Sequence, residues 1–224
     1  MLYADRAEAG RALAASLTEY AGRPDVVVLA LPRGGVPVAS RVAQALDAPL
    51  DVFLVRKLGF PGSEEFAMGA IASGGVRVLN EPVLERYGVP EAVVETIARR
   101  EERELTRREK SYRGDLPPLD LHGKTAIVVD DGLATGFSMR AAVKALRSLG
   151  PRRIVVAVPV GPRETVEELR LLADQVVCPA MPEPFLAVGR FYDDFEQTTD
   201  REVIDLLARA RRLEPAAAAE GRPS

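Results

Sequence analysis

Short apolar runs alternate with amphipathic stretches along the chain. The apolar runs contain four to six residues, are rich in β-branched side chains and are flanked by turn-forming residues, which is typical of buried strands. The expected strands are Val26–Leu31, Leu50–Val55, Thr125–Val129, Ile154–Val158 and Gln175–Cys178. Because helix-like stretches separate them, we expect βαβ units around a parallel sheet, and therefore an α/β fold.

Helical spacing of apolar residues predicts the helices that cover this sheet. Asp5 with Glu8, and Thr199 with Glu202, have the spacing of a capping box just before two of these stretches. The expected helices cover about residues 6–20, 38–46, 142–149, 163–173 and 199–211.

Two segments depart from this alternation. Residues 90–113 have the pattern of a long, highly charged helix with a thin apolar stripe. Such faces are usually solvated, so an exposed helix is the preferred interpretation, with a subunit contact or a moving lid as the alternatives. We expect the terminal residues 214–224 to be disordered.

Scarce residue types exclude several kinds of chemistry. The 224 residues include one histidine, His122, one cysteine, Cys178, and no tryptophan. A Cys/His zinc site and an internal disulfide are therefore excluded, and a histidine-dependent catalytic triad would rely on His122 alone. We expect His122 to lie in a turn and Cys178 to be a small core residue.

The charge balance and hydropathy limit the expected partners. Lysine and arginine number 30 and aspartate and glutamate 33, so the net charge is −3. This argues against a protein that coats nucleic acid, whose surface should be basic. No apolar run approaches the ~18 residues of a membrane span, and the N-terminus lacks the apolar core of a signal peptide. We therefore expect a soluble cytoplasmic protein with no nucleic-acid or membrane partner.

The stretch Ala126–Ser138, AIVVDDGLATGFS, carries the most informative chemistry. An apolar strand ends in two carboxylates, Asp130 and Asp131, and a turn of small residues leads into a helix. Such a turn points backbone N–H groups at one spot beside the positive end of a helix, which is typical of a phosphate site. Thr135 and Ser138 add hydroxyl donors, and the two acids suit a sugar diol or a hydrated divalent ion. The pattern describes a cradle for a ribose 5-phosphate.

Two other protein classes place paired acids after an apolar strand. P-loop NTPases also need a G-x-x-x-x-G-K-[ST] sequence, which this chain lacks. Phosphoacceptor receiver domains carry the pair on their first strand, whereas here it lies in the middle of the chain and a Thr-Gly turn follows. The Thr-Gly turn disfavours the receiver interpretation.

The sequence VVDDGLATGFS resembles the phosphoribosyl-pyrophosphate (PRPP) motif of type I phosphoribosyltransferases. Members of that family often have a third acid where this chain has Ala134, and that acid is credited with acid–base catalysis on the nucleobase. The Leu-Ala-Thr-Gly sequence of this chain is similar to that of the uracil-type enzymes. The resemblance implies that Asp130 and Asp131 bind the ribose hydroxyls. The residues it implies for the 5-phosphate are Leu133, Ala134, Thr135, Gly136, Phe137 and Ser138.

Two loops after the first and second apolar runs also resemble that family. Arg33-Gly34-Gly35 combines a glycine turn with an arginine suited to phosphate, and is similar to the pyrophosphate loop of the xanthine-guanine enzymes. Val55–Gly62, with Lys57, resembles the opening of the flexible loop in the adenine and orotate enzymes. The resemblance implies that Lys57 reaches the pyrophosphate and that residues 58–75 close over the reaction.

Within that loop, Glu64 or Glu65 is a hypothetical contact to the acceptor base. The alternative is an ordinary solvated carboxylate, as most loop acids are.

Residues 185–194, FLAVGRFYDD, resemble the hood of the hypoxanthine-guanine enzymes after a one-residue slip. The hood binds the base, so Phe185, Phe191 and Tyr192 are the candidates for stacking on it. The alternative is an edge strand and turn whose aromatic side chains belong to the core.

The resemblance implies a Rossmann-like parallel-sheet core flanked by helices. We expect one domain over residues 1–213, with the core at about 25–57 and 123–180, a helical insertion at about 76–115 and a hood at about 181–198.

The implied activity is transfer of the 5-phosphoribosyl group from PRPP to a nucleobase-like nitrogen acceptor, with release of pyrophosphate. Arg33, Lys57 and the amides of Gly34 and Gly35 would neutralise the leaving group together with Mg²⁺, which PRPP and water would mainly hold. A homodimer is common in the family. The alternative is a regulatory module that binds PRPP or a nucleotide on the same fold without transferase activity.

Overall fold

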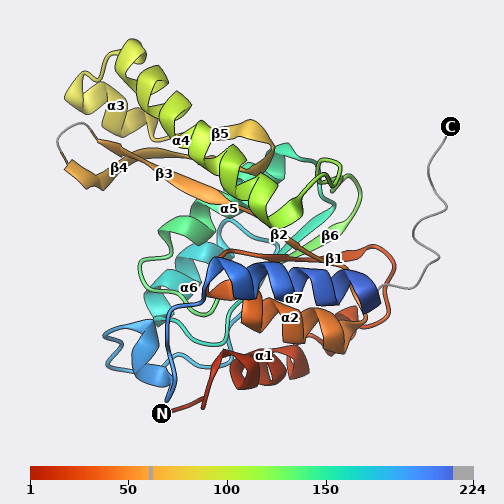
Figure 1. Cartoon of the computed structure of the whole chain (residues 1–224). Coiled ribbons are helices and arrows are strands. Elements are labelled where there is room, and N and C mark those ends of the chain that lie inside the picture. Colours follow the sequence, from red (N-terminus) through yellow and green to blue (C-terminus); the bar gives the residue numbers. More distant parts are fainter. Residues whose placement is uncertain (61–62, 214–224) are drawn as a thin grey trace, which may run out of the picture.

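A five-stranded parallel sheet forms the centre of the computed structural model, which describes residues 1–60 and 63–213 (Figure 1). The strand order is β2-β1-β6-β7-β8. Their bounds are β1 Val26–Ala30, β2 Leu50–Val52, β6 Thr125–Val129, β7 Arg153–Ala157 and β8 Gln175–Val177. These strands correspond to the five predicted apolar runs. Both faces of β1, β6 and most of β7 are buried, which explains why these runs are continuously apolar rather than alternating.

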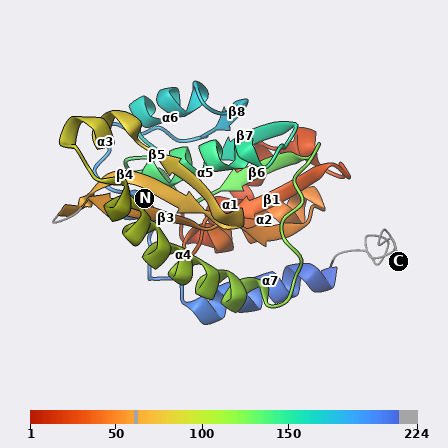
Figure 2. The same cartoon turned by 90° about the horizontal axis from the view of Figure 1, so that it is seen from above.

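Helices cover both faces of this sheet. Figure 2 shows α6 and α7 on opposite sides of it. One face packs against α1 (Arg6–Ala15), α2 (Gly35–Leu46) and α7 (Asp200–Leu213), and the other against α5 (Phe137–Ser148) and α6 (Arg163–Arg170). The fold is therefore the predicted α/β architecture of a parallel sheet between helices.

The two predicted capping boxes mark the starts of α1 and α7. The Asp5 carboxylate accepts from the amide of Glu8 at 2.7 Å, and the Glu8 carboxylate accepts in turn from the amide of Ala4. At α7, the amide of Thr199 donates to Glu202 at 2.8 Å and the amide of Glu202 donates to the Thr199 hydroxyl at 3.2 Å. These contacts satisfy amides that have no partner within the helix.

A second, antiparallel sheet includes the segment 58–75, where a flexible, closing loop is expected. In the described residues it has the order β3-β4-β5, with bounds β3 Val55–Phe60, β4 Ser63–Ala72 and β5 Val76–Leu79. Leu58, Met68 and Ile71 bury their side chains on the face toward α4 (Glu91–Arg113), and Ala72 packs toward α5. Because these apolar side chains have a core to enter, the described part of the segment forms a packed β-ribbon, and its closure over the reaction stays a prediction.

The expected helical insertion at 76–115 begins with strand β5 and continues as α3 (Glu81–Tyr87) and the long helix α4. The apolar stripe of α4, with Val94, Ala98 and Leu105, is buried against β3, β4 and α7, and its charged residues lie mostly outside. Glu101 is buried and accepts from Arg56 of β3, with Nε–Oε2 at 2.9 Å. The helix is thus solvated on one side and packed on the other.

The remaining expectations concern single residues. His122 lies exposed in the turn before β6, as predicted. Cys178 lies at the edge of the core, half-buried, and burial raises the pKa of its thiol to about 11. The expected disordered tail, 214–224, lies outside the described residues. Within the described part of the chain, no helix has the length and apolar character required to cross a bilayer.

Candidate functional site

The site lies where the strand order reverses direction. β1 pairs with β2 on one side and with β6 on the other, so the chain leaves β1 and β6 toward opposite faces of the sheet. Crevices at the carboxyl ends of such strands are the usual ligand sites of open α/β sheets. The loops that follow β1 and β6 contain the two principal predicted motifs, and the amide of Leu31 donates to the carbonyl of Val129 at 2.9 Å between them.

The predicted phosphate loop connects β6 to α5 as a turn at the start of a helix. Leu133 anchors it, with a buried side chain and an amide that donates to the carbonyl of Val160 at 2.9 Å. Ala134, Thr135 and Ser138 are exposed, as a loop that receives an anion requires. Gly136 is the N-cap residue of α5 and has φ of +68°, a conformation that L side chains rarely adopt.

The two acids at the end of β6 differ in their partners. The Asp131 carboxylate accepts from Nε of Arg6 at 2.8 Å, and the Asp130 carboxylate accepts from the amide of Asp131 at 2.9 Å. Burial, together with the charge of Asp131, raises the pKa of Asp130 well above its ordinary value. Burial also raises the pKa of Asp131, although Arg6 opposes this effect. Two adjacent carboxylates with one arginine leave an excess of negative charge, which a hydrated cation or sugar hydroxyls would stabilise.

The glycine turn of the predicted pyrophosphate loop lies directly against these acids. A Cβ at Gly34 would collide with the carboxylate of Asp131, and one at Gly35 would lie 2.7 Å from the carbonyl of Val129 and 3.0 Å from Cα of Asp130. Side chains at these positions would therefore separate the two loops. The structure brings Gly34 and Gly35 together with Asp130 and Asp131, while the amide of Gly35 already donates to the carbonyl of Leu31 at 3.1 Å.

Arg33 lies at the edge of the same turn. Its guanidinium is one-third exposed, with Nη1 3.7 Å from Oδ1 of Asp200, the first residue of α7. The same Asp200 oxygen accepts from the hydroxyl of Tyr112 at 2.5 Å. Burial, and to a smaller extent this hydrogen bond, raises the pKa of Tyr112 to about 12. Arg33 therefore has a carboxylate partner that an anionic ligand would have to replace.

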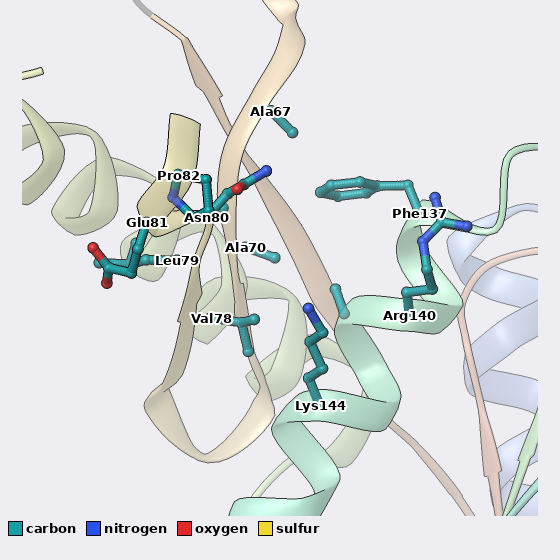
Figure 3. Close-up of a pocket in the computed structure, with 12 residues that line it drawn as sticks. Ala67, Ala70, Val78, Leu79, Asn80, Glu81, Pro82, Phe137, Arg140 and Lys144 are labelled. Carbon is teal, nitrogen blue, oxygen red and sulfur yellow. The ribbon is translucent and has the colours of Figure 1, made fainter. Parts of the chain in front are cut away.

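Lys57 lies in β3, opposite Ala70 of β4. Its neighbour Arg56 points to α4, so alternation along the strand places Lys57 on the face toward α5. On this face a cavity of about 440 Å³ lies between the ribbon and α5. Figure 3 shows the ring of Phe137 directed into it, with Lys144 farther along α5. The Phe137 side chain thus lines this cavity, and only its backbone is left to serve a phosphate at the loop. The side chains of Glu64 and Glu65 lie outside the described part of the structure.

The expected hood residues separate into two groups. Phe185 and Phe191 are half-buried, with ring centroids 5.1 Å apart. Tyr192 is only 2% exposed, and its hydroxyl donates to the carbonyl of Asp131 at 2.6 Å. Its ring packs against Tyr3, so it has no free face for stacking, and the prediction remains for Phe185 and Phe191 only.

The sequence interpretation missed four residues at this site: Tyr3, Arg6, Tyr112 and Asp200. The first two belong to the N-terminus, which lies beside the hood in Figure 1. One feature of the sequence could have pointed to Arg6. It is a cation in the first turn of a helix, where the helix dipole disfavours positive charge.

A family model described as "Phosphoribosyl transferase domain" matches residues 2–195. A Mycobacterium tuberculosis (strain CDC 1551 / Oshkosh) protein, named only provisionally as phosphoribosyl transferase MT0597, is 47% identical over 211 residues, which cover 94% of this chain and 47% of that protein. The chain therefore spans about half the length of this curated relative.

Two further relatives match with different coverage. Bifunctional protein PyrR of Roseiflexus sp. (strain RS-1) is 30% identical over 146 residues, 62% of this chain and 57% of PyrR. The crystal structure of TT1426 from Thermus thermophilus has a TM-score of 0.83 and 45% identity, and the match covers 93% of this chain and 99% of TT1426.

Proposed function

Because this chain belongs to the phosphoribosyl transferase domain family, we propose that it transfers the 5-phosphoribosyl group of PRPP to a nitrogenous, nucleobase-like acceptor. The observation that carries the proposal is the contact between the glycine turn after β1 and the paired acids after β6. That contact unites a candidate pyrophosphate site with a candidate ribose phosphate site.

Each group would have a distinct task. The amides of residues 134–138 and the hydroxyls of Thr135 and Ser138 hold the 5-phosphate at the positive end of α5, and Asp130 and Asp131 accept from the ribose hydroxyls. The acceptor nitrogen attacks C1, and pyrophosphate leaves with the electron pair of the broken C1–O bond. Positive charge grows on the ribose and negative charge on pyrophosphate, so Arg33 and Lys57 act on the side of the leaving group.

Mg²⁺ fits this site, because only one of the two partly buried carboxylates, that of Asp131, is paired with an arginine. PRPP oxygens and water would mainly hold the ion, and its chemistry is to neutralise the leaving pyrophosphate. The ion pair between Arg33 and Asp200 must open for Arg33 to reach the pyrophosphate. Because this pair is partly exposed and 3.7 Å long, breaking it costs little free energy.

A screen for acceptors tests this function. The full chain would be incubated with PRPP, Mg²⁺ and panels of purines, pyrimidines and other amines, and pyrophosphate release would be measured. We expect at least one acceptor to drive release, and an Arg33→Met variant to lower the rate while ribose 5-phosphate binding persists. PRPP binding without release for any acceptor would favour the regulatory alternative. No PRPP binding at all would refute the proposal.

A further inference from the structure

Arg6 connects three parts of the molecule through one guanidinium. Its Nε donates to Oδ2 of Asp131 at 2.8 Å, and its Nη1 donates to the carbonyl of Glu196 at 2.7 Å. The guanidinium also lies over the ring of Phe195, 3.9 Å from the centroid. The Arg6 side chain is 12% exposed and that of Asp131 is 15% exposed. This pair is therefore shielded from the solvent screening that weakens most surface ion pairs.

The N-terminal segment that carries Arg6 is joined to the hood by backbone hydrogen bonds. The amides of Leu2 and Tyr3 lie 3.0 Å from the carbonyl of Phe191. In return, the amide of Asp193 donates to the carbonyl of Tyr3 at 2.9 Å. Arg6 is thus tied to the hood through the N-terminal segment and through its contact with Glu196, so a shift of the hood would also move the Arg6 guanidinium.

Asp131 is constrained both at its carboxylate and at its backbone. Arg6 occupies Oδ2, Gly34 approaches the same oxygen, and Tyr192 donates to the Asp131 carbonyl at 2.6 Å. A carboxylate has two oxygens, so a partner that occupies Oδ2 leaves Oδ1 to accept from a hydroxyl. Without Arg6, the carboxylate would be free to rotate and would be repelled by Asp130.

We propose that Arg6 is a positioning residue, which holds the Asp131 carboxylate in the orientation that accepts from the ribose diol and links that orientation to the hood. The inference rests on the proposed function. It predicts that Arg6 matters for ligands that contain the ribose, and not for ligands that bind only at the pyrophosphate loop.

The test compares Arg6→Met, Arg6→Lys and Arg11→Met by calorimetry with PRPP, ribose 5-phosphate and pyrophosphate, each with Mg²⁺. Arg11 is the matched control, because it is an exposed arginine on the same helix. We expect Arg6→Met to bind PRPP and ribose 5-phosphate about 10- to 100-fold more weakly, the range for loss of a hydrogen bond between charged groups. Pyrophosphate affinity and the affinities of Arg11→Met should stay within about twofold of wild type. Arg6→Lys should recover part of the loss, since it restores the charge but not the fork of donors.

The outcomes separate the two proposals. Unchanged affinity for ribose 5-phosphate in a folded Arg6→Met protein overturns the role of Arg6 and leaves the proposed function intact. Equal losses for pyrophosphate and ribose 5-phosphate overturn it too, because they indicate general damage to the site. If Arg6→Met fails to fold, Arg6→Lys decides, and wild-type affinity of that variant for both PRPP and ribose 5-phosphate contradicts the need for an arginine at this position. A wild-type protein that binds none of the three ligands overturns both proposals.

Discussion

Replacing Gly136 by alanine should test the phosphate loop more directly than changing any polar residue. Gly136 has φ of +68°, and an added Cβ would collide with Cγ2 of Thr165 and lie 3.1 Å from Nη1 of Arg140. Gly123 offers a matched control, with φ of +71° and no atom within 4 Å of the added Cβ. The two variants share the backbone strain, and only Gly136→Ala adds the collision.

The expected magnitudes follow from these two contributions. An L residue in the left-handed region costs about 1–2 kcal/mol, offset by about 0.4–1 kcal/mol because the unfolded chain loses entropy, so Gly123→Ala should cost about 1 kcal/mol. Overpacking adds about 1–3 kcal/mol, so Gly136→Ala should cost about 3 kcal/mol. At about 2–4 °C per kcal/mol for a chain of this size, Tm should fall by about 3 °C in the control and about 10 °C in Gly136→Ala.

The assay combines thermal unfolding with PRPP calorimetry at a temperature where both variants are folded. Gly136→Ala should bind PRPP at least tenfold more weakly, because relief of the collision moves the amides at the start of α5. Gly123→Ala should bind like wild type. Equal loss of Tm in the two variants would refute the packing argument, and wild-type PRPP affinity in Gly136→Ala would remove this loop from the phosphate site.

Three further predictions concern charge. Burial raises the pKa of Asp130, so the native state holds this proton more tightly than the unfolded state does, and Asp130 lowers the free energy of unfolding as pH rises above about 3.8. The Asp130→Asn variant has no such proton to lose. Its free energy of unfolding, measured by urea titration, should therefore exceed that of wild type by an amount that grows between about pH 4 and pH 8. Glu101→Gln breaks the buried pair with Arg56 and should cost about 3 kcal/mol by urea denaturation. Chelation of Mg²⁺ should abolish pyrophosphate release in the acceptor screen, and added Mg²⁺ should restore it.

Each of these predictions has its own control or contrary result. A constant difference between Asp130→Asn and wild type across the pH range would mean that Asp130 is not perturbed. Glu102→Gln on the same helix breaks an exposed 3.4 Å contact with Arg77 and should cost less than about 1 kcal/mol, so equal effects at 101 and 102 would contradict the burial argument. Release that continues in excess chelator would exclude the ion from the reaction.

The candidate site was predictable where its chemistry is local in sequence. The strand, the paired acids and the small-residue turn at 126–138 occupy consecutive positions, and backbone geometry alone brings their amides and carboxylates to one end of the sheet. The same holds for the capping boxes at Asp5 and Thr199, whose partners lie three residues away. These predictions required only residue types at short, fixed spacings, which the sequence shows directly.

Tertiary structure decided the features that depend on distant partners. The ribbon of β3 and β4 forms because α4 and α5 supply a core for its apolar side chains, and no local sequence pattern within 58–75 predicts that packing. Tyr192 was a candidate for base stacking until its ring proved to be buried beside Tyr3, and Arg6 pairs with an acid 125 positions away. The sequence by itself predicted which groups are candidates for binding a ribose phosphate. Only the folded chain decided which of these side chains are exposed at the two loops and which are buried or paired, because that depends on contacts across the sheet and between distant parts of the chain.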